Sequence, residues 1–134
     1  AQKKPLLGIC LGMQLLFDSS LEFGLHTGLG LIPGQVRPLA PRLEGSGLKV
    51  PHMGWNRLEI LQNDPIFQDV ENGEYVYYVH SFYAADCAGS TLATSPYGVA
   101  VPGMVKRGLV YGAQFHPEKS GDTGLRILRA FAGL

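Results

Sequence analysis

The segment Gly8-Ile9-Cys10-Leu11-Gly12 constrains the fold of this chain more than any other feature of its sequence. The apolar run at 6–9 is typical of a strand buried on both faces. After it, the apolar residues at 13–17 have helical spacing and predict a helix that ends near residues 18–20. A strand that turns sharply into a helix between two glycines has the form of a nucleophile elbow. We therefore expect Cys10 to occupy a strand-to-helix turn in an α/β fold.

Such an elbow would favour nucleophilic chemistry at Cys10. Flanking glycines let the strand and the helix approach closely. The start of a helix favours a thiolate because the helix dipole and free N–H groups face it. The N–H of Leu11 could form half of an oxyanion hole. The alternative is that Cys10 is a small buried apolar residue, as free cysteines often are.

A second segment, Phe115-His116-Pro117-Glu118, follows a predicted strand. His116 and Glu118 are two residues apart, so they point the same way in an extended chain, and Pro117 favours that extension. The carboxylate could then hold one imidazole nitrogen and leave the other for a nucleophile. The alternative is a surface histidine beside a solvated Glu118. Together with Cys10, the segment supplies a Cys–His–acid constellation for nucleophilic catalysis.

The rest of the chain predicts many strands between two helices, in a layered α/β domain. A loop is expected at 24–34, and Asp64 is expected to cap a short helical turn that ends at Phe67. Strands are expected at 35–39, 57–61, 74–80 and 92–95, with a hairpin of 104–106 and 109–115 that turns at Arg107-Gly108. A last helix is expected to be capped by Asp122 or Thr123, with Leu125, Leu128 and Phe131 inward and Arg126 and Arg129 outward.

Composition excludes several classes of protein. The 134 residues suit one domain, and 46% apolar with 16% charged residues is typical of a globular chain. A formal net charge of zero leaves no basic excess for nucleic acid or an anionic membrane. The longest apolar stretch, 6–17, is too short to span a bilayer. Two cysteines form no disulfide framework, so we expect a cytoplasmic protein.

No cofactor or metal is expected. The four histidines, His26, His52, His80 and His116, form no metal-ligand pattern, and Cys87 lies in a polar segment without a partner at zinc spacing. We interpret His26 as a loop residue. His80 ends a predicted strand and is either structural or part of the active-site wall.

Residues 8–14 (Gly-Ile-Cys-Leu-Gly-Met-Gln) together with 115–118 resemble the class I, or triad-type, glutamine amidotransferases. The resemblance implies that Cys10 attacks the side-chain amide of glutamine. His116 would then move protons, and Glu118 would orient His116.

The same resemblance implies a set of glutamine-binding residues. Gln14 stands four residues after the cysteine, where the family binds substrate. Glu22 stands where the family holds the α-amino group. The dipeptide Ser81-Phe82 matches the one that offers backbone groups to the substrate.

Residues 50–56 (Val-Pro-His-Met-Gly-Trp-Asn) narrow the resemblance to the glutaminase subunits of imidazole glycerol phosphate synthases, and 78–83 and 116–120 fit them. This implies a role in histidine biosynthesis, with ammonia passed to a (βα)₈-barrel cyclase subunit. The resemblance places four residues near that partner: Trp55, Asn56, Tyr77 and Lys119. Without the resemblance, residues 50–56 could equally form a loop with Trp55 in the core.

The resemblance also implies that residues 1–134 are the C-terminal portion of a single three-layer α/β/α, flavodoxin-like domain. We expect the chain to lack the N-terminal βα units and the loop with the second oxyanion donor. It should then show an unpaired sheet edge and be poorly active alone. Two alternatives remain. One is a glutaminase for anthranilate, aminobenzoate or GMP synthesis, against which 51–56 argues; the other is a non-catalytic α/β interaction module.

Overall fold

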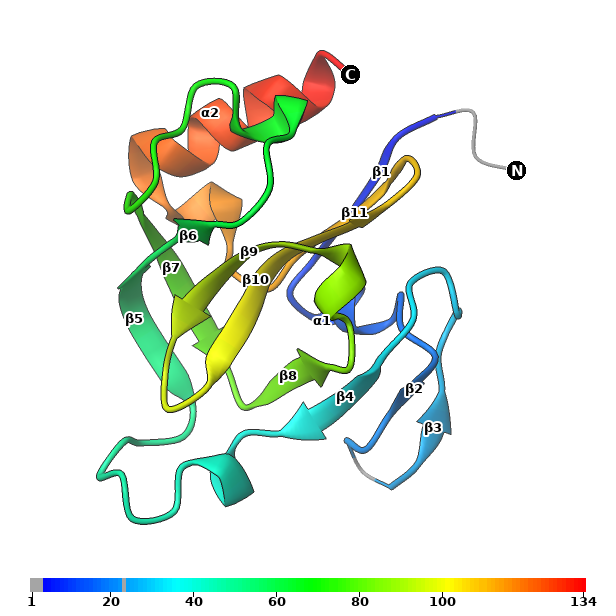
Figure 1. The fold of residues 1–134 in the computed structure, drawn as a ribbon, viewed down its shortest axis with the longest axis vertical. Coiled ribbons are helices and arrows are strands. Elements are labelled where there is room, and N and C mark those ends of the chain that lie inside the picture. Colours follow the sequence, from blue (N-terminus) through cyan, green and yellow to red (C-terminus); the bar gives the residue numbers. More distant parts are fainter. Residues whose placement is uncertain (1–3, 23) are drawn as a thin grey trace.

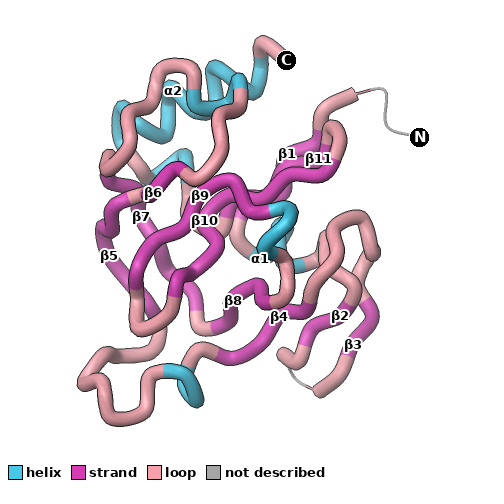
Figure 2. The backbone as a smooth tube through the Cα atoms, in the orientation of Figure 1, coloured by secondary structure: helices cyan, strands magenta, loops and turns pink. Residues whose placement is uncertain are grey.

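The computed structural model describes residues 4–22 and 24–134, and strands dominate this part of the chain (Figures 1 and 2). Three sheets have the strand orders β1-β11-β10-β9-β6, β3-β2-β4-β8 and β5-β7. The strands are β1 (Leu6–Ile9), β2 (Ser19–Ser20), β3 (His26–Thr27), β4 (Gln35–Pro38), β5 (His52–Arg57), β6 (Glu59–Ile60), β7 (Tyr75–His80), β8 (Phe82–Ala85), β9 (Thr91–Pro96), β10 (Ala100–Arg107) and β11 (Val110–Ala113). The α-helices are α1 (Leu11–Gln14) and α2 (Gly121–Ala132), and the 3₁₀ turns are η1 (Ala40–Arg42), η2 (Pro65–Phe67), η3 (Ala88–Ser90) and η4 (Pro117–Lys119).

Strand β1 lies at the edge of the five-stranded sheet and pairs in parallel with β11, with Ile9 opposite Ala113. Its other side has no partner strand in the described part of the chain. The expected unpaired sheet edge is therefore confirmed. The expectation that the strand is buried on both faces is wrong, because Leu6 is 40% exposed and the rest of β1 is only half-buried.

The two faces of this sheet pack against different helices. Tyr111 and Ala113 of β11 lie in one apolar core with Ile127 of α2. Val110 lies in a second core with Met13 of α1. Alternate residues of a strand point to opposite faces, so α2 covers one face and α1 the other. The expected layered α/β arrangement is confirmed.

Helix α1 is only one turn long and ends at Gln14, well before the expected residues 18–20. The carbonyls of residues 15–17 accept hydrogen bonds from the N–H groups of residues 29–31 at 2.8–3.1 Å. These carbonyls are therefore not available to extend the helix. A Cβ at Gly28 would stand 2.0 Å from the carbonyl oxygen of Phe17, so glycine permits this close approach.

Most of the expected strands are confirmed: β4, β7, β9 and both strands of the β10–β11 hairpin. The hairpin turns one residue later than expected, at Gly108 and Leu109, because Arg107 pairs with Val110. Asp64 caps η2 as expected, its Oδ1 accepting from the N–H of Ile66 at 3.0 Å.

Two expectations about the strands were wrong. Residues 52–57 form β5, paired with β7, which leaves only Glu59–Ile60 as β6 from the expected strand at 57–61. His26 lies in β3, paired with β2, rather than in a loop. The β5–β7 pairing joins segments 18–28 residues apart, which local patterns do not reveal. The β2–β3 pairing is local, but each of its strands has only two residues, too few to show an alternating pattern.

Helix α2 begins at Gly121, and neither Asp122 nor Thr123 caps it. The residue before the helix is Ser120, whose hydroxyl donates to the carbonyl of His116 at 2.7 Å and accepts from the N–H of Tyr77 at 2.9 Å. The hydroxyl at the helix start thus fixes η4 against β7 and makes no capping bond.

The buried face of α2 also differs from the expected one. Thr123, Gly124, Ile127 and Ala130 are buried, whereas Leu125 is 44% exposed. A Cβ at Gly124 would lie 1.9 Å from the carbonyl oxygen of Pro117, so the helix backbone touches η4 there. Leu128 and Phe131, which were expected to face inward, are half-buried. Of the two residues expected to face outward, Arg129 is exposed and Arg126 is half-buried.

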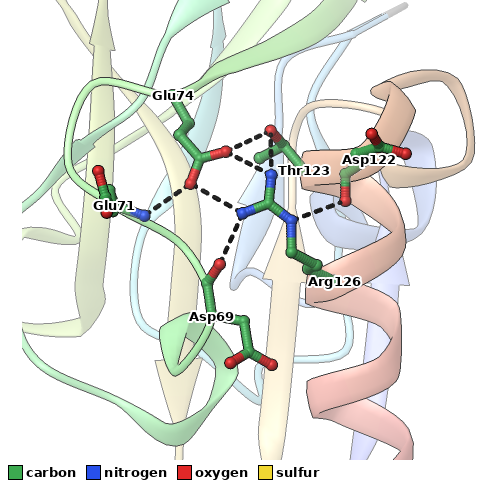
Figure 3. Close-up of polar contacts among 6 residues, drawn as sticks. All are labelled: Asp69, Glu71, Glu74, Asp122, Thr123 and Arg126. Carbon is green, nitrogen blue, oxygen red and sulfur yellow. Dashed lines mark hydrogen bonds and ion pairs between the residues drawn. The ribbon is translucent and has the colours of Figure 1, made fainter.

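A cluster around Glu74 ties α2 to the start of β7 (Figure 3). The Arg126 guanidinium donates to both carboxylate oxygens of Glu74, at 2.6 and 3.1 Å, and Thr123 Oγ1 donates at 2.7 Å. The N–H of Glu71 donates from the other side at 2.7 Å. These donors, Arg126 first, lower the pKa of Glu74 to about 2.

Replacing Glu74 by glutamine should lower the free energy of unfolding by about 1–2 kcal/mol at neutral pH, since the ion pair is partly screened by water. A lowered folded-state pKa stabilises above the ordinary carboxyl pKa, and the stability is lost as the pH falls toward about 2. The difference between wild type and variant should therefore shrink in acid. Urea unfolding at several pH values measures it, with exposed Glu71→Gln as the control. A difference independent of pH would contradict the assignment.

Candidate active site

Cys10 sits at the turn from β1 to α1 in a backbone conformation that non-glycine residues rarely adopt, with φ 54° and ψ −107°. Its N–H donates to the carbonyl of Ala113 at 2.7 Å, which continues the β1–β11 pairing into the turn. A Cβ at Gly8 would lie 2.6 Å from the carbonyl oxygen of Gly12, so Gly8 allows the strand and helix to meet. The strained elbow expected from the sequence is present, and strain of this kind gathers at functional sites.

The thiol of Cys10 is half-buried between two polar groups. Its Sγ lies 3.8 Å from the carbonyl oxygen of Val79, to which it donates, and 3.7 Å from Nε2 of Gln114, from which it accepts. Burial raises the pKa of the thiol, with Glu118 and Glu22 adding to the increase, against the lowering by the N–H of Leu11 and by Gln114. The N–H of Leu11 at the helix start does lower the pKa of the thiol, as expected, but burial outweighs it, so the pKa of Cys10 is raised on balance.

The imidazole of His116 is held by Glu118 as the spacing predicted. Nδ1 of His116 lies 2.8 Å from Oε2 of Glu118, and the intervening Pro117 opens η4. The main-chain N–H of His116 donates to the carbonyl of Tyr77 at 2.9 Å. Because the carboxylate occupies Nδ1, Nε2 is the nitrogen that a nucleophile could use.

Two features bring Cys10 and His116 to the same end of the sheet. They follow the carboxyl ends of neighbouring parallel strands, β1 and β11. They also contact the same strand, β7, through the carbonyls of Val79 and Tyr77 respectively. Carbonyls two residues apart on a strand face the same way and are about 7 Å apart. In the described contacts Sγ bonds to Val79 and Gln114, so a direct bond to His116 stays a prediction for the substrate-bound state.

A cavity of about 220 Å³ opens beside the elbow. It is lined by Leu11, Gln14, Leu15, Ser20, Glu22 and His26. The cavity thus brings two of the expected glutamine-binding residues, Gln14 and Glu22, next to the expected oxyanion donor. A carboxylate, an amide and a backbone N–H could together hold a small zwitterion.

The dipeptide Ser81-Phe82 is anchored inside the protein by its carbonyls. The carbonyl of Ser81 accepts from the N–H of Leu39 at 3.0 Å. That of Phe82 accepts from Nε2 of Gln14 at 3.3 Å and from Nδ1 of His80 at 2.7 Å. Contact between this dipeptide and a substrate stays a prediction. The carbonyl of Phe82 already accepts two hydrogen bonds, whereas that of Ser81 can accept a second one.

His80 is part of a buried pair with His52. Since Nδ1 of His80 donates to a carbonyl, its Nε2 must accept from Nδ1 of His52, 2.9 Å away. Nε2 of His52 then accepts from the amide of Asn56 at 3.3 Å. Burial lowers the pKa of both histidines to about 4, so both are neutral near pH 7. Of the two interpretations of His80, the structural one agrees with this geometry.

Trp55 lies on β5 and is 55% exposed. The alternative that residues 50–56 form a loop with Trp55 in the core is therefore wrong. The ring of Trp55 meets that of Tyr77 edge-on, with the ring centroids 5.8 Å apart. Gly121 lies close to the same indole: a Cβ added to Gly121 would be 3.9 Å from Cη2 of Trp55. The exposed Lys119 lies two residues before that glycine. We call Trp55, Tyr77 and Lys119 the β5–β7 surface. Asn56 differs from them, because its amide points inward and donates to the carbonyl of Pro96 at 2.8 Å.

Sequence reasoning missed Gln114, which is fully buried between Cys10 and Gln14. The sequence feature that could have revealed Gln114 is its place as the one amide side chain in the otherwise apolar predicted strand at 109–115. Cys87 lies in the loop between β8 and η3, as expected, but its side chain is buried, with its Sγ 3.6 Å from Oγ1 of Thr91. Among the described residues, no three histidine, cysteine, aspartate or glutamate side chains gather as metal ligands. No helix within 4–22 or 24–134 has the length and apolar character needed to cross a membrane.

Comparison with known proteins identifies relatives along nearly the whole chain. A family model described as glutamine amidotransferase class-I matches residues 1–132. The chain is 55% identical over 128 residues to the imidazole glycerol phosphate synthase subunit HisH of Listeria monocytogenes serotype 4b (strain CLIP80459), which covers 96% of this chain and 60% of that protein. It is 53% identical over 132 residues to the HisH of Bacillus cytotoxicus, covering 98% and 60%. The chain thus spans about 60% of the length of these curated relatives.

Solved structures show the same fold. A putative GMP synthase component from Thermoplasma acidophilum superposes with a TM-score of 0.67 at 23% identity, covering 98% of this chain and 57% of the other. A glutamine amidotransferase from Thermotoga maritima superposes with a TM-score of 0.61 at 22% identity, covering 96% and 47%. At this identity the likeness concerns the fold alone.

Proposed function

We propose that this chain, which belongs to the class-I glutamine amidotransferase family, works as part of the glutaminase subunit of an imidazole glycerol phosphate synthase. The identity of 55% to proteins named HisH supports this assignment over other members of the class. The strained elbow at Cys10, at the same sheet end as the His116–Glu118 pair, carries the chemical part of the proposal. In this role the protein would hydrolyse glutamine and deliver the ammonia for histidine biosynthesis.

The proposed reaction is acyl transfer through Cys10. His116 takes the thiol proton through Nε2 while Sγ bonds to the amide carbon of glutamine. Glu118 stabilises the imidazolium that forms, and the N–H of Leu11 donates to the developing oxyanion. The C–N bond then breaks, and ammonia leaves with the proton from His116. Water, activated by His116, attacks the thioester, which releases glutamate and restores the thiol.

The raised pKa of Cys10 fits this division of labour. A thiol that stays protonated at rest reacts slowly with unrelated electrophiles, because the thiolate is the nucleophile. Attack then depends on His116 as the base. Glutamine in the cavity beside Leu11 would have Glu22 for its α-amino group and Gln14 for a polar contact, with Ser81-Phe82 as a further backbone contact.

The full-length protein, mixed with its cyclase partner, should release glutamate and ammonia from glutamine in equal amounts. Glutamate formation followed by a coupled dehydrogenase assay measures the activity, and asparagine serves as the control substrate. The proposal predicts hydrolysis of glutamine and not of asparagine. If the complex hydrolyses neither amide, the non-catalytic interaction module becomes the better interpretation.

We propose that the β5–β7 surface contacts a (βα)₈-barrel cyclase. An exposed tryptophan beside a tyrosine has the composition of an interface hot spot, and Lys119 lies next to this pair. The amide of Asn56 is engaged inside the protein, so Asn56 would act at this contact through its backbone or through His52. Both thiols are free, and we propose the reducing cytoplasm as the compartment.

Replacing Trp55 by alanine should weaken cyclase binding at least about tenfold, because it removes the largest exposed side chain of this surface. Isothermal titration of the two purified subunits measures the change. Leu61→Ala is the matched control, since Leu61 is 60% exposed but lies outside the β5–β7 surface. Equal affinities of wild type and the Trp55 variant would remove this surface from the proposal.

A further inference from the structure

Gln114 connects the thiol of Cys10 to the interior of the protein. It follows β11 directly and has no exposed surface. Its Nε2 lies 3.7 Å from Sγ of Cys10, and its Oε1 lies 3.1 Å from Nε2 of Gln14. The main-chain N–H of Gln114 donates to the carbonyl of Gly103 at 2.9 Å, which anchors its backbone to β10.

The orientation of the Gln114 amide follows from its neighbours. The carbonyl of Phe82 can only accept, so the Gln14 atom 3.3 Å from it must be the NH₂ group. That NH₂ group also faces Gln114, so the facing atom of Gln114 must be its oxygen. The NH₂ group of Gln114 therefore points at Sγ. A main-chain carbonyl thus fixes which end of the amide meets the sulfur.

The two contacts of Sγ respond oppositely to loss of the thiol proton. The carbonyl of Val79 accepts from the S–H group, and this bond is lost when the proton leaves. The NH₂ group of Gln114 donates to sulfur in both states, and donation to a charged acceptor is stronger. A hydrogen bond to the charged form of a group lowers its pKa.

We propose that Gln114 is a positioning residue for the nucleophile: its side-chain amide holds Sγ at the elbow and stabilises the thiolate as it forms. This deepens the proposed function and rests on it, since Cys10 is the nucleophile of that proposal. The other groups that act on the sulfur are Glu118 of η4 and Glu22 beyond β2, which disfavour the thiolate, and the N–H of Leu11, which favours it. His116, held by Glu118, is the titratable group that would take the proton.

Two variants separate the roles of the amide. Gln114→Glu keeps an oxygen toward Gln14 and, once ionised, has no donor for Sγ. Gln114→Met has a similar length and removes both contacts. Gln62→Met is the control for the substitution itself, because Gln62 is exposed and donates to the carbonyl of Thr91, away from Cys10.

The experiment measures alkylation of Cys10 by iodoacetamide in the full-length protein as a function of pH, with peptide mass spectrometry to separate Cys10 from Cys87. Loss of the donor should slow Cys10 alkylation near neutral pH about threefold to tenfold and move the profile to higher pH. The Gln114→Met variant is the decisive one, because it removes the donor without adding a charge. The buried Cys87 reports on packing and should react equally slowly in every protein.

Each outcome decides the proposal. A shifted Cys10 profile with unchanged Cys87 reactivity supports it. An unshifted profile in Gln114→Met overturns it, as does faster alkylation of both cysteines, which would give Gln114 a merely structural role. Alkylation needs no turnover, so a wild-type protein that hydrolyses no glutamine would contradict the proposed function and leave the test of Gln114 valid.

Discussion

Replacing Cys10 by alanine should abolish glutamine-dependent synthesis by the complex with the cyclase, lowering its rate by at least about 10⁴-fold. Alanine has no nucleophile to form the thioester, and neither Leu11 nor His116 can replace it. Synthesis from added ammonia should continue at the wild-type rate, because only the release of ammonia needs the thiol. Rates with glutamine and with an ammonium salt, measured on the same preparation, test both parts.

Cys87→Ala is the control for this variant. Cys87 is buried in the core that contains Met13, and its sulfur contacts Thr91 rather than the elbow. We expect both rates to stay close to wild type. If Cys10→Ala retained glutamine-dependent synthesis, another residue would have to be the nucleophile.

Replacing Gly8 by alanine should disrupt the elbow itself. The new Cβ would lie 2.6 Å from the carbonyl oxygen of Gly12 and 2.9 Å from the nitrogen of Met13, and both are backbone atoms that cannot rotate away. We expect the free energy of unfolding to fall by about 2–3 kcal/mol. The displaced turn should also lower the rate of glutamine hydrolysis about 100-fold. Urea unfolding and glutamate release measure the two effects.

Gly12→Ala is the matched control, because it makes the same change at the other glycine of the motif. A Cβ there has nothing within 4 Å, and the residue lies inside α1. Alanine favours a helix over glycine by up to about 1 kcal/mol, so this variant should be as stable as wild type or slightly more so. Equal losses in both variants would mean that close packing at Gly8 is not what holds the elbow.

The amino-acid sequence by itself determined the features that depend on neighbouring residues. The turn at Cys10, the pairing of His116 with Glu118 and the cap at Asp64 all followed from backbone geometry over a few residues. Strands such as β7 followed from their aromatic and β-branched residues. These features need only local sterics and local hydrogen bonds, which a short segment carries with it.

Tertiary structure decided whatever depends on groups that are distant in the chain. The chain does not continue as a helix after α1 because residues 29–31 donate to the carbonyls of residues 15–17, which follow the helix. Leu125 faces solvent because Gly124 packs on η4. The pKa of Cys10 is raised because burial, which no local motif encodes, outweighs the N–H groups at the helix start. The amide of Gln114 reaches Sγ only because β11 pairs with β1. Long-range pairing therefore set the electrostatics of the site, while the local sequence set which residues stand in it.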